Sequence, residues 1–149
     1  MIRQAVGAIV FQGDMFLLVG KVKVMDMPEG PEDMPFGWYI PGGGVIETDR
    51  SNLEAIRREL VEETGSTNFR IVRELEEKLC FRFPLEIKER TGFERQETTM
   101  FLVEYMGAGD DLVPNDDEID VVEFVTREEL FQRIFVKETK EYLRRFLEV

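Results

Sequence analysis

The chain contains no histidine and only one cysteine, Cys80. Without histidine, a serine or cysteine nucleophile has no imidazole base to activate it. A single cysteine excludes an intrachain disulfide and a cysteine-rich zinc cluster, and it suits a reducing cytoplasm. Proton transfer near neutral pH must therefore fall to carboxylates, lysine, tyrosine or metal-bound water.

Long apolar runs are also missing. No stretch approaches the roughly 20 apolar residues that a membrane-spanning helix needs. Residues 1–11 hold a short apolar run but no basic segment followed by a cleavage site. We therefore expect a cytoplasmic protein without a membrane partner.

Basic residues are few, with 19 lysines and arginines against 31 acidic residues and a net charge of −12. An acidic surface repels nucleic-acid backbones, so duplex nucleic acid is not an expected partner. A small phosphorylated substrate that arrives with its cation remains allowed. At 149 residues the chain suits one domain, 1–149, and is too short for two ordinary ones. The sequence leaves a homodimer open.

Apolar runs rich in β-branched and aromatic residues predict strands. They lie at 5–11, 15–19, 38–40, 69–83 (one strand or a pair), 93–105 and 119–125. The segments 25–37, 86–92 and 107–118 predict connections, the first because of its three prolines.

Helices are expected at three places. Residues 51–64 carry the apolar stripe Leu53, Ile56 and Leu60, with Gly65 as a C-cap. A capping box beginning at Thr126 predicts a short helix, and 137–147 form an amphipathic one. Strands with interspersed helices predict a mixed α/β sandwich.

A glycine run, 42–44, leads into the first of these helices, which carries Arg58, Glu59, Glu62 and Glu63 near its end. Positions i, i+3 and i+4 share one helix face, so three carboxylates crowd one patch and repel each other. A bound divalent cation would relieve the repulsion, and Mg²⁺, Mn²⁺ and Ca²⁺ prefer carboxylate oxygens. The alternative is an acidic face turned to solvent.

This stretch resembles the Nudix box, whose pattern is G-x5-E-x7-R-E-U-x-E-E-x-G-U, with U a bulky apolar residue. Gly44 fits the first glycine and residues 58–65 fit the dense second half. Glu47 and the Pro-Gly-Gly lead-in at 41–43 are also similar to family members. Two positions depart from the pattern, because Arg50 replaces a glutamate and Ser66 replaces an apolar residue.

The resemblance implies a mixed, curved β-sheet between α-helices and hydrolysis of a nucleoside diphosphate linked to another group. Mg²⁺ or Mn²⁺ is the implied cofactor. Glu59 is implied to be a metal ligand or the base, and Arg58 to hold a box glutamate in position. The implied metal ligands are Glu59, Glu62, Glu63 and, at the end of the glycine loop, Glu47.

Further site residues lie outside the helix. Gly43 and Gly44 allow the backbone to come close to a substrate. Lys21 and Lys23 are candidates for phosphate contacts, although each fits a surface charge as well. Many family members add a glutamate from a distant loop, and Glu118 is the first choice here, with Glu97 second.

Arg50 leaves three outcomes open. The missing glutamate is structural and Arg50 pairs with Glu54, or Glu47 or Asp49 compensates, or the activity is weak or absent. The leading hypothesis is a pyrophosphohydrolase, with a nucleoside triphosphate or dinucleoside polyphosphate preferred. The alternative is a catalytically impaired nucleotide-binding or regulatory module.

Overall fold

The computed structural model of the protein describes residues 1–24, 27–114 and 117–147. Within these residues the chain forms one mixed sheet of eight strands. The strands are β1 (Ile2–Gln12), β2 (Met15–Val24), β3 (Glu32–Tyr39), β4 (Gly42–Gly44), β5 (Phe69–Glu74), β6 (Leu79–Arg82), β7 (Arg95–Tyr105) and β8 (Ile119–Val125). The helices are α1 (Asn52–Thr64), α2 (Leu85–Thr91), α3 (Arg127–Arg133) and α4 (Lys137–Leu147).

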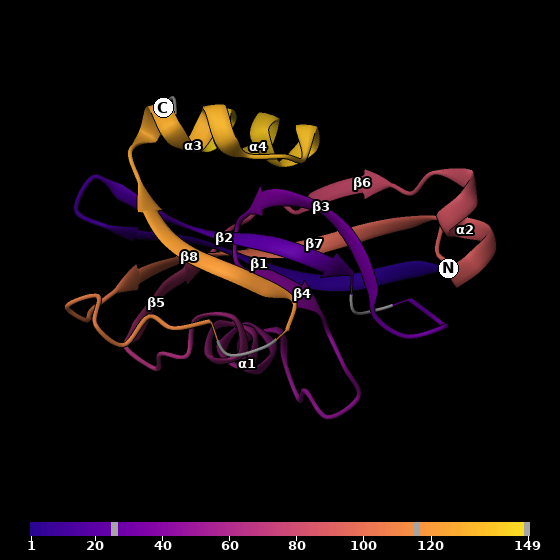
Figure 1. Ribbon diagram of the computed structural model, residues 1–149, viewed down its shortest axis with the longest axis horizontal. Coiled ribbons are helices and arrows are strands. Elements are labelled where there is room, and N and C mark those ends of the chain that lie inside the picture. Colours follow the sequence, from indigo (N-terminus) through magenta and orange to yellow (C-terminus); the bar gives the residue numbers. More distant parts are fainter. Residues whose placement is uncertain (25–26, 115–116, 148–149) are drawn as a thin grey trace.

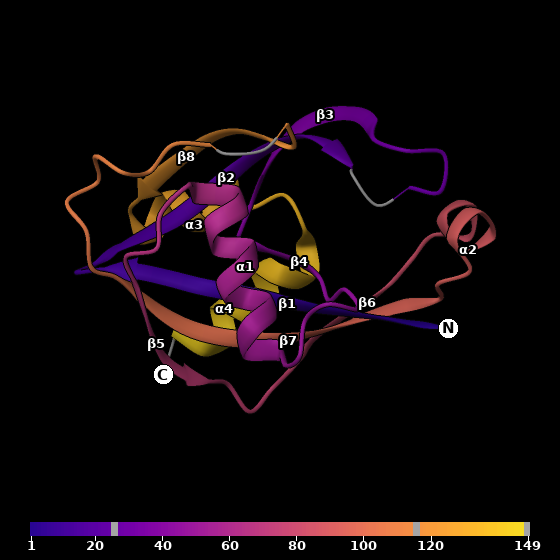
Figure 2. The ribbon, with the colours of Figure 1, turned by 90° about the horizontal axis from the view of Figure 1, so that it is seen from below.

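The sheet lies between two helical layers, as Figure 1 shows. Helix α1 covers one face, α3 and α4 cover the other, and α2 stands at the end of the sheet near β6. Seen from below, α1 crosses the sheet over β1 and β7 (Figure 2). The predicted α/β sandwich is confirmed. None of the described helices is long and apolar enough to cross a membrane.

The strand order is β3-β2-β1-β7-β5, with β4 paired to β1, β6 to β7 and β8 to β2. The first two strands form a hairpin, in which Phe11 pairs with Phe16. Strands β1 and β7 are parallel along most of their length. The centre of β1 is buried on both faces, which explains its continuous apolar run from Ala5 to Val10.

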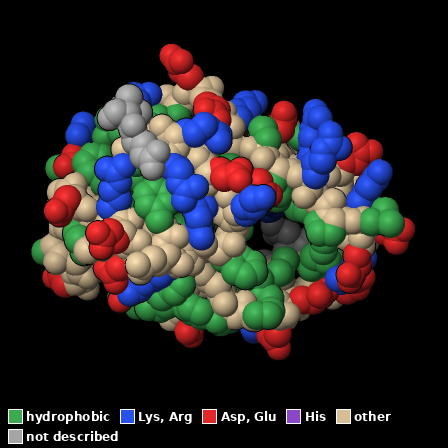
Figure 3. Space-filling view, turned by 90° about the horizontal axis from the view of Figure 1, so that it is seen from above, with side chains coloured by type: hydrophobic (Ala, Val, Ile, Leu, Met, Phe, Trp, Pro, Cys, Tyr) green, Lys and Arg blue, Asp and Glu red, His purple; other side chains and the backbone are tan. Residues whose placement is uncertain are grey.

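The face that carries α3 and α4 is hollowed, with hydrophobic side chains around the opening (Figure 3). Under these helices, Ile9, Leu18 and Met100 pack with Tyr142 and Leu143. The capping box at the start of α3 is present as predicted, since Thr126 and Glu129 exchange their hydrogen bonds. These contacts fix the C-terminal helices on the sheet.

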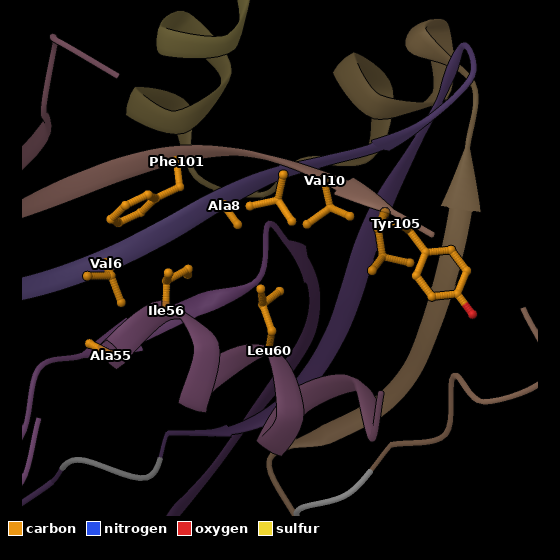
Figure 4. Close-up of a cluster of buried hydrophobic side chains, with 10 residues drawn as sticks. Val6, Ala8, Val10, Ala55, Ile56, Leu60, Phe101 and Tyr105 are labelled. Carbon is orange, nitrogen blue, oxygen red and sulfur yellow. The ribbon is translucent and has the colours of Figure 1, made fainter. Parts of the chain in front are cut away.

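The other half of the core lies between α1 and the sheet. Val6, Ala8 and Val10 alternate along β1 and face the helix, as Figure 4 shows. Ile56 and Leu60 project from α1 to meet them. Together they seat α1 on the sheet beside the glycine strand β4.

The prediction that Leu53 belongs to the buried apolar stripe of α1 was wrong. Leu53 is 42% exposed. The buried residues of α1 are Ala55, Ile56, Glu59, Leu60, Glu63 and Thr64. The prediction failed because the helix turns two of its glutamates, rather than its first-turn leucine, toward the sheet.

Two predicted connections differ from expectation, and the structure chooses between the two alternatives for 69–83. The segment 86–92 lies mostly in α2, because it is free of proline and rich in helix formers and ends at Gly92 with φ +81°. The segment 69–83 is a pair of strands, β5 and β6. Strand β3 begins within the predicted loop 25–37 and tolerates Pro35 because it lies at the sheet edge. Residues 25–26 and 115–116 of the predicted loops lie outside the described residues.

Ser66, which replaces an apolar residue of the box pattern, has a structural role that the sequence analysis did not predict. The residue is buried, and its hydroxyl donates to Asp111 Oδ2 at 2.6 Å. The same hydroxyl oxygen accepts a hydrogen bond from the backbone amide of Asn68 at 3.0 Å. The serine therefore ties the end of α1 to the loop that follows β7.

We expect Ser66→Ala to lower the free energy of unfolding by about 1–2 kcal/mol, because Asp111 loses a hydrogen bond to its carboxylate. Chemical denaturation at constant pH measures this change. Thr67→Ala is the matched control, since Thr67 is exposed. Equal midpoints for the two variants would contradict the assigned role of Ser66.

Candidate active site

The glycine run forms β4 and lies directly against β1. Gly42 has φ +155°, and a Cβ there would lie 2.3 Å from the carbonyl oxygen of Val6. Only glycine allows this close approach. The approach directs the Gly42 amide to Glu63 Oε1, at 2.7 Å. The strand and the helix are thus joined by a contact between the two ends of the predicted box.

The next two glycines of β4 contact side chains of the box helix. A Cβ on Gly43 would lie 2.5 Å from Glu59 Oε1. Arg58 Nη2 donates to the carbonyl oxygen of Gly44 at 3.0 Å. The absence of a side chain at Gly43 therefore makes a cradle that Glu59 fills, and the backbone of Gly44 holds Arg58.

Arg58 is the centre of a carboxylate cluster. Its Nε and Nη2 donate to the two oxygens of Asp49, both at 2.9 Å. Its Nη1 donates to Glu59 Oε1 at 3.0 Å and Glu62 Oε2 at 3.2 Å. The bidentate pair with Asp49 fixes the guanidinium plane, and the guanidinium in turn orients the two glutamates.

Arg50 is turned away from this cluster. Its side chain is 88% exposed, and its Nε lies 3.0 Å from Glu54 Oε2, the i+4 pair considered from the sequence. The carboxylate that anchors Arg58 comes instead from the preceding residue. Asp49 is held in place by the Ile46 amide, which donates to Oδ2 at 2.9 Å, and its side chain is only 3% exposed.

Lys21 joins a second pair of carboxylates. Its Nζ lies 3.1 Å from Glu63 Oε2 and 3.0 Å from Glu118 Oε1. Glu118 precedes β8, so the predicted loop glutamate reaches the site. Lys21 was expected to contact phosphate, but the structure places its ammonium between two carboxylates.

Burial shifts the pKa values of these groups. Desolvation raises the pKa of Glu59 to about 7, against the attraction of Arg58. Desolvation likewise raises the pKa of Glu63, and the Lys21 ammonium offsets only part of that rise. Burial alone would lower the pKa of Lys21, but Glu63 and Glu118 outweigh it and raise that pKa above its ordinary value. A nearby cation would favour the ionised glutamates.

The site opens into a cavity of about 900 Å³. Its charged and polar lining includes Arg3 and Gln96, which the sequence analysis missed. Arg3 Nη1 donates to Gln96 Oε1, and a Cβ on Gly44 would lie 2.7 Å from Arg3 Nη2. No spacing pattern links these two residues, because the parallel pairing of β1 with β7 brings them together. The apolar lining includes Met34, Trp38, Ile40, Phe93 and Ile134.

Most of the predicted site residues meet at this cavity. Those that line it are Lys21, Lys23, Gly43, Gly44, Arg58, Glu59, Glu62 and Glu118. Glu63 is fully buried and contacts Lys21 at the cavity wall. Glu47 is exposed in the loop after β4, and neither it nor Glu97 is among the described lining residues.

A NUDIX domain family model matches residues 1–146. The chain belongs to the Nudix family. Members of this family are hydrolases that act on phosphorus-containing acid anhydrides, and this chain is an enzyme of that class. Residues 42–65, which were predicted to form the Nudix box, make up β4, the loop that follows it, and α1 with its C-cap.

Relatives with curated names support this assignment. An RNA pyrophosphohydrolase of Bartonella bacilliformis is 27% identical over 119 residues, which cover 78% of this chain and 69% of that protein. The match to two further RNA pyrophosphohydrolases, of Bartonella tribocorum and Bartonella clarridgeiae, spans 48% of their length. The chain thus corresponds to only part of the length of these relatives.

Solved structures share the Nudix fold. A NUDIX hydrolase from Nitrosomonas europaea matches with a TM-score of 0.72 and 17% identity, over 99% of this chain and 90% of that one. A C. elegans Ap4A hydrolase in a binary complex matches with a TM-score of 0.67 and 19% identity, over 98% and 96% of the two chains. At these identities the likeness establishes the fold alone.

Nudix hydrolases generally use divalent metal ions. Across residues 1–24, 27–114 and 117–147, no three acidic or cysteine side chains already converge as a metal site. The glutamates are paired with Arg58 and Lys21 instead. The donor set still fits a hard cation, because Glu59, Glu62 and Glu63 supply carboxylate oxygens, and the buried Glu63 Oε2 has no hydrogen bond from the described residues beyond its ion pair with Lys21. Half-exposed Glu62 can rotate toward such a cation.

Proposed function

We propose that the protein is a metal-dependent Nudix pyrophosphohydrolase that cleaves a diphosphate linkage in a nucleotide-type substrate, and that residues 1–149 form a single hydrolase domain. The observation that carries the proposal is the position of Arg58. It holds Glu59 and Glu62 against the glycine strand, at the wall of a 900 Å³ cavity that also contains lysines. A solvated acidic helix face would have neither the buried glutamates nor the cavity.

In this proposal Glu59, Glu62 and Glu63 hold Mg²⁺ or Mn²⁺. The cation neutralises phosphate oxygens and lowers the pKa of a water molecule. Glu59 or Glu118 accepts the proton of the attacking water, since both line the cavity. Glu47 joins the ligands only if its loop moves, because its side chain is exposed.

We assign phosphate binding to the basic side chains and the backbone that line the cavity. Lys23 and Arg3 line it and are assigned to the phosphate oxygens. Gly43 and Gly44 bring bare backbone to the same wall. The predicted contact of Lys21 with phosphate needs one of its two carboxylate partners to be released.

The substrate class is proposed from the relatives. The relatives are RNA pyrophosphohydrolases, and one structural neighbour is an Ap4A hydrolase. A 5′-triphosphate RNA end, a dinucleoside polyphosphate and a nucleoside triphosphate share a polyphosphate joined to a nucleoside, which this cavity has the charges and the apolar surface to bind. The net charge of −12 disfavours duplex nucleic acid. A cytoplasmic location and a homodimer stay predictions.

The alternative of a catalytically impaired module was based on Arg50. It loses that support, because Asp49 supplies the carboxylate that anchors Arg58. Intact Glu59, Glu62 and Glu63 favour catalysis.

Product release in the presence of Mg²⁺ or Mn²⁺ tests the function. The panel includes 5′-triphosphate RNA, dinucleoside polyphosphates, nucleoside triphosphates, nucleotide sugars and ADP-ribose, with Glu59→Gln as the control variant. We expect metal-dependent turnover of at least one polyphosphate by the native protein. Metal binding without turnover of any substrate would favour the module instead.

A further inference from the structure

Lys21 lies at irregularities in the pairing of β2 with β3 and with β8. The pairing with β8 shifts register between Gly20 and Lys21, and the pairing with β3 shifts between Lys21 and Lys23. Such bulges redirect side chains and are frequent next to active sites. The adjoining Val22 amide donates to the carbonyl oxygen of Glu118 at 3.1 Å. The strand backbone therefore fixes Lys21 and Glu118 relative to each other.

The partners of the ammonium are equally fixed. Glu63 is fully buried, and its other oxygen, Oε1, accepts from the Gly42 amide. The Lys21 ammonium lies 5.5 Å from the centre of the Tyr39 ring, and its side chain is 14% exposed. The Lys21 ammonium is therefore enclosed by the site and held in a fixed position, unlike that of an exposed surface lysine.

A divalent cation cannot bridge the same two carboxylates while this ammonium stays in place. Metal–oxygen distances for Mg²⁺ are about 2.1 Å. A metal bound to Glu63 Oε2 would therefore lie no more than about 5 Å from an ammonium that is 3.1 Å from that oxygen. Two positive charges at that separation repel strongly in a buried site.

We propose that the Lys21 ammonium is a resident cation of the active site, which occupies the position between Glu63 and Glu118 and excludes a divalent ion from it. Divalent ions in the free enzyme are then held on the Arg58 side of the cluster, by Glu59, Glu62 and, of Glu63, only Oε1, the oxygen that also accepts from the Gly42 amide. This inference rests on the proposed metal-dependent function. It assigns Lys21 to the control of metal number and affinity in place of a direct phosphate contact.

The test is Mn²⁺ binding to the full chain without nucleotide, measured by isothermal titration and by the electron paramagnetic resonance of free Mn²⁺. We expect Lys21→Met to bind one additional Mn²⁺, or to bind Mn²⁺ at least about tenfold more tightly than the native protein, because the competing charge is gone. Adding Glu118→Gln to this variant should remove the gain.

Two matched variants separate this effect from a general change in charge. Lys23→Met removes a cation from the same strand and cavity, but Lys23 lies outside the ion pairs with Glu63 and Glu118. Lys21→Arg keeps a cation between them. We expect both to bind Mn²⁺ as the native protein does. Lys21→Gln serves if thermal unfolding shows that the methionine variant does not fold.

The outcomes are distinct. Native Mn²⁺ binding together with an unchanged Lys21→Met would overturn the resident-cation role and leave the proposed hydrolase intact. A gain of the same size in Lys23→Met would also overturn it, because the effect would then be one of overall charge. Absence of Mn²⁺ binding in every variant would overturn the proposed metal-dependent function as well.

Discussion

Replacing Glu59 with glutamine is expected to lower kcat by about 10²–10⁴-fold. The carboxylate lies in the cradle of Gly43 and accepts from Arg58 Nη1 at 3.0 Å. Glutamine has nearly the same shape and keeps an oxygen for Arg58, but it is a poor metal ligand and cannot act as a base. The loss should therefore fall on turnover, whichever of the two roles Glu59 has.

Steady-state kinetics at saturating Mg²⁺ measure this loss, and chemical denaturation verifies that the variant is folded. Glu54→Gln is the matched control, because Glu54 lies on the same helix and pairs with exposed Arg50, away from the cavity. Near-native turnover by the Glu59 variant would refute the assignment of this helix face to catalysis.

Replacing Asp49 with alanine is expected to lower kcat/KM by about 10–100-fold. Asp49 is a positioning residue, since it contacts Arg58 through two hydrogen bonds and does not line the cavity. Without Asp49 the plane of the Arg58 guanidinium is no longer fixed. Arg58 then no longer holds Glu59 and Glu62 in a defined position. The effect should include weaker binding of Mn²⁺, which a purely structural role in the loop would not produce.

Two further variants sharpen this test. Asp49→Glu retains the charge and should recover part of the metal affinity. Arg50→Ala should change kcat/KM little, because Arg50 is exposed and its pair with Glu54 is a surface ion pair. A larger loss in Arg50→Ala than in Asp49→Ala would show that the anchoring of Arg58 has been assigned to the wrong residue.

Much of this arrangement follows from the sequence. The glycine run, the helix with its Gly65 cap, and the burial of Ile56 and Leu60 all come from local patterns. Local patterns hold here because caps and periodicity act within a few residues. Glu118, predicted as the loop glutamate because it directly precedes a strand, lines the cavity.

The parts that sequence did not predict depend on distant contacts. Arg3 and Gln96 meet because β1 and β7 run parallel, a pairing of strands some 90 residues apart. The sequence around Lys21 did not predict the bulges in β2, which direct the Lys21 side chain to two carboxylates. Helix α2 was taken for a loop because its charged residues have no apolar period, and none of them is buried.

The charges gathered around Arg58 and Lys21 have a thermodynamic consequence. Five carboxylates, those of Asp49, Glu59, Glu62, Glu63 and Glu118, gather around these two cations. The folded chain therefore retains self-repulsion that its unfolded form, with these groups far apart, does not have. Any cation that binds only the folded form adds stability by mass action, about 2.7 kcal/mol at a concentration 100 times its Kd. The cofactor supply of the cell would then set the lifetime of the protein as well as its rate of turnover.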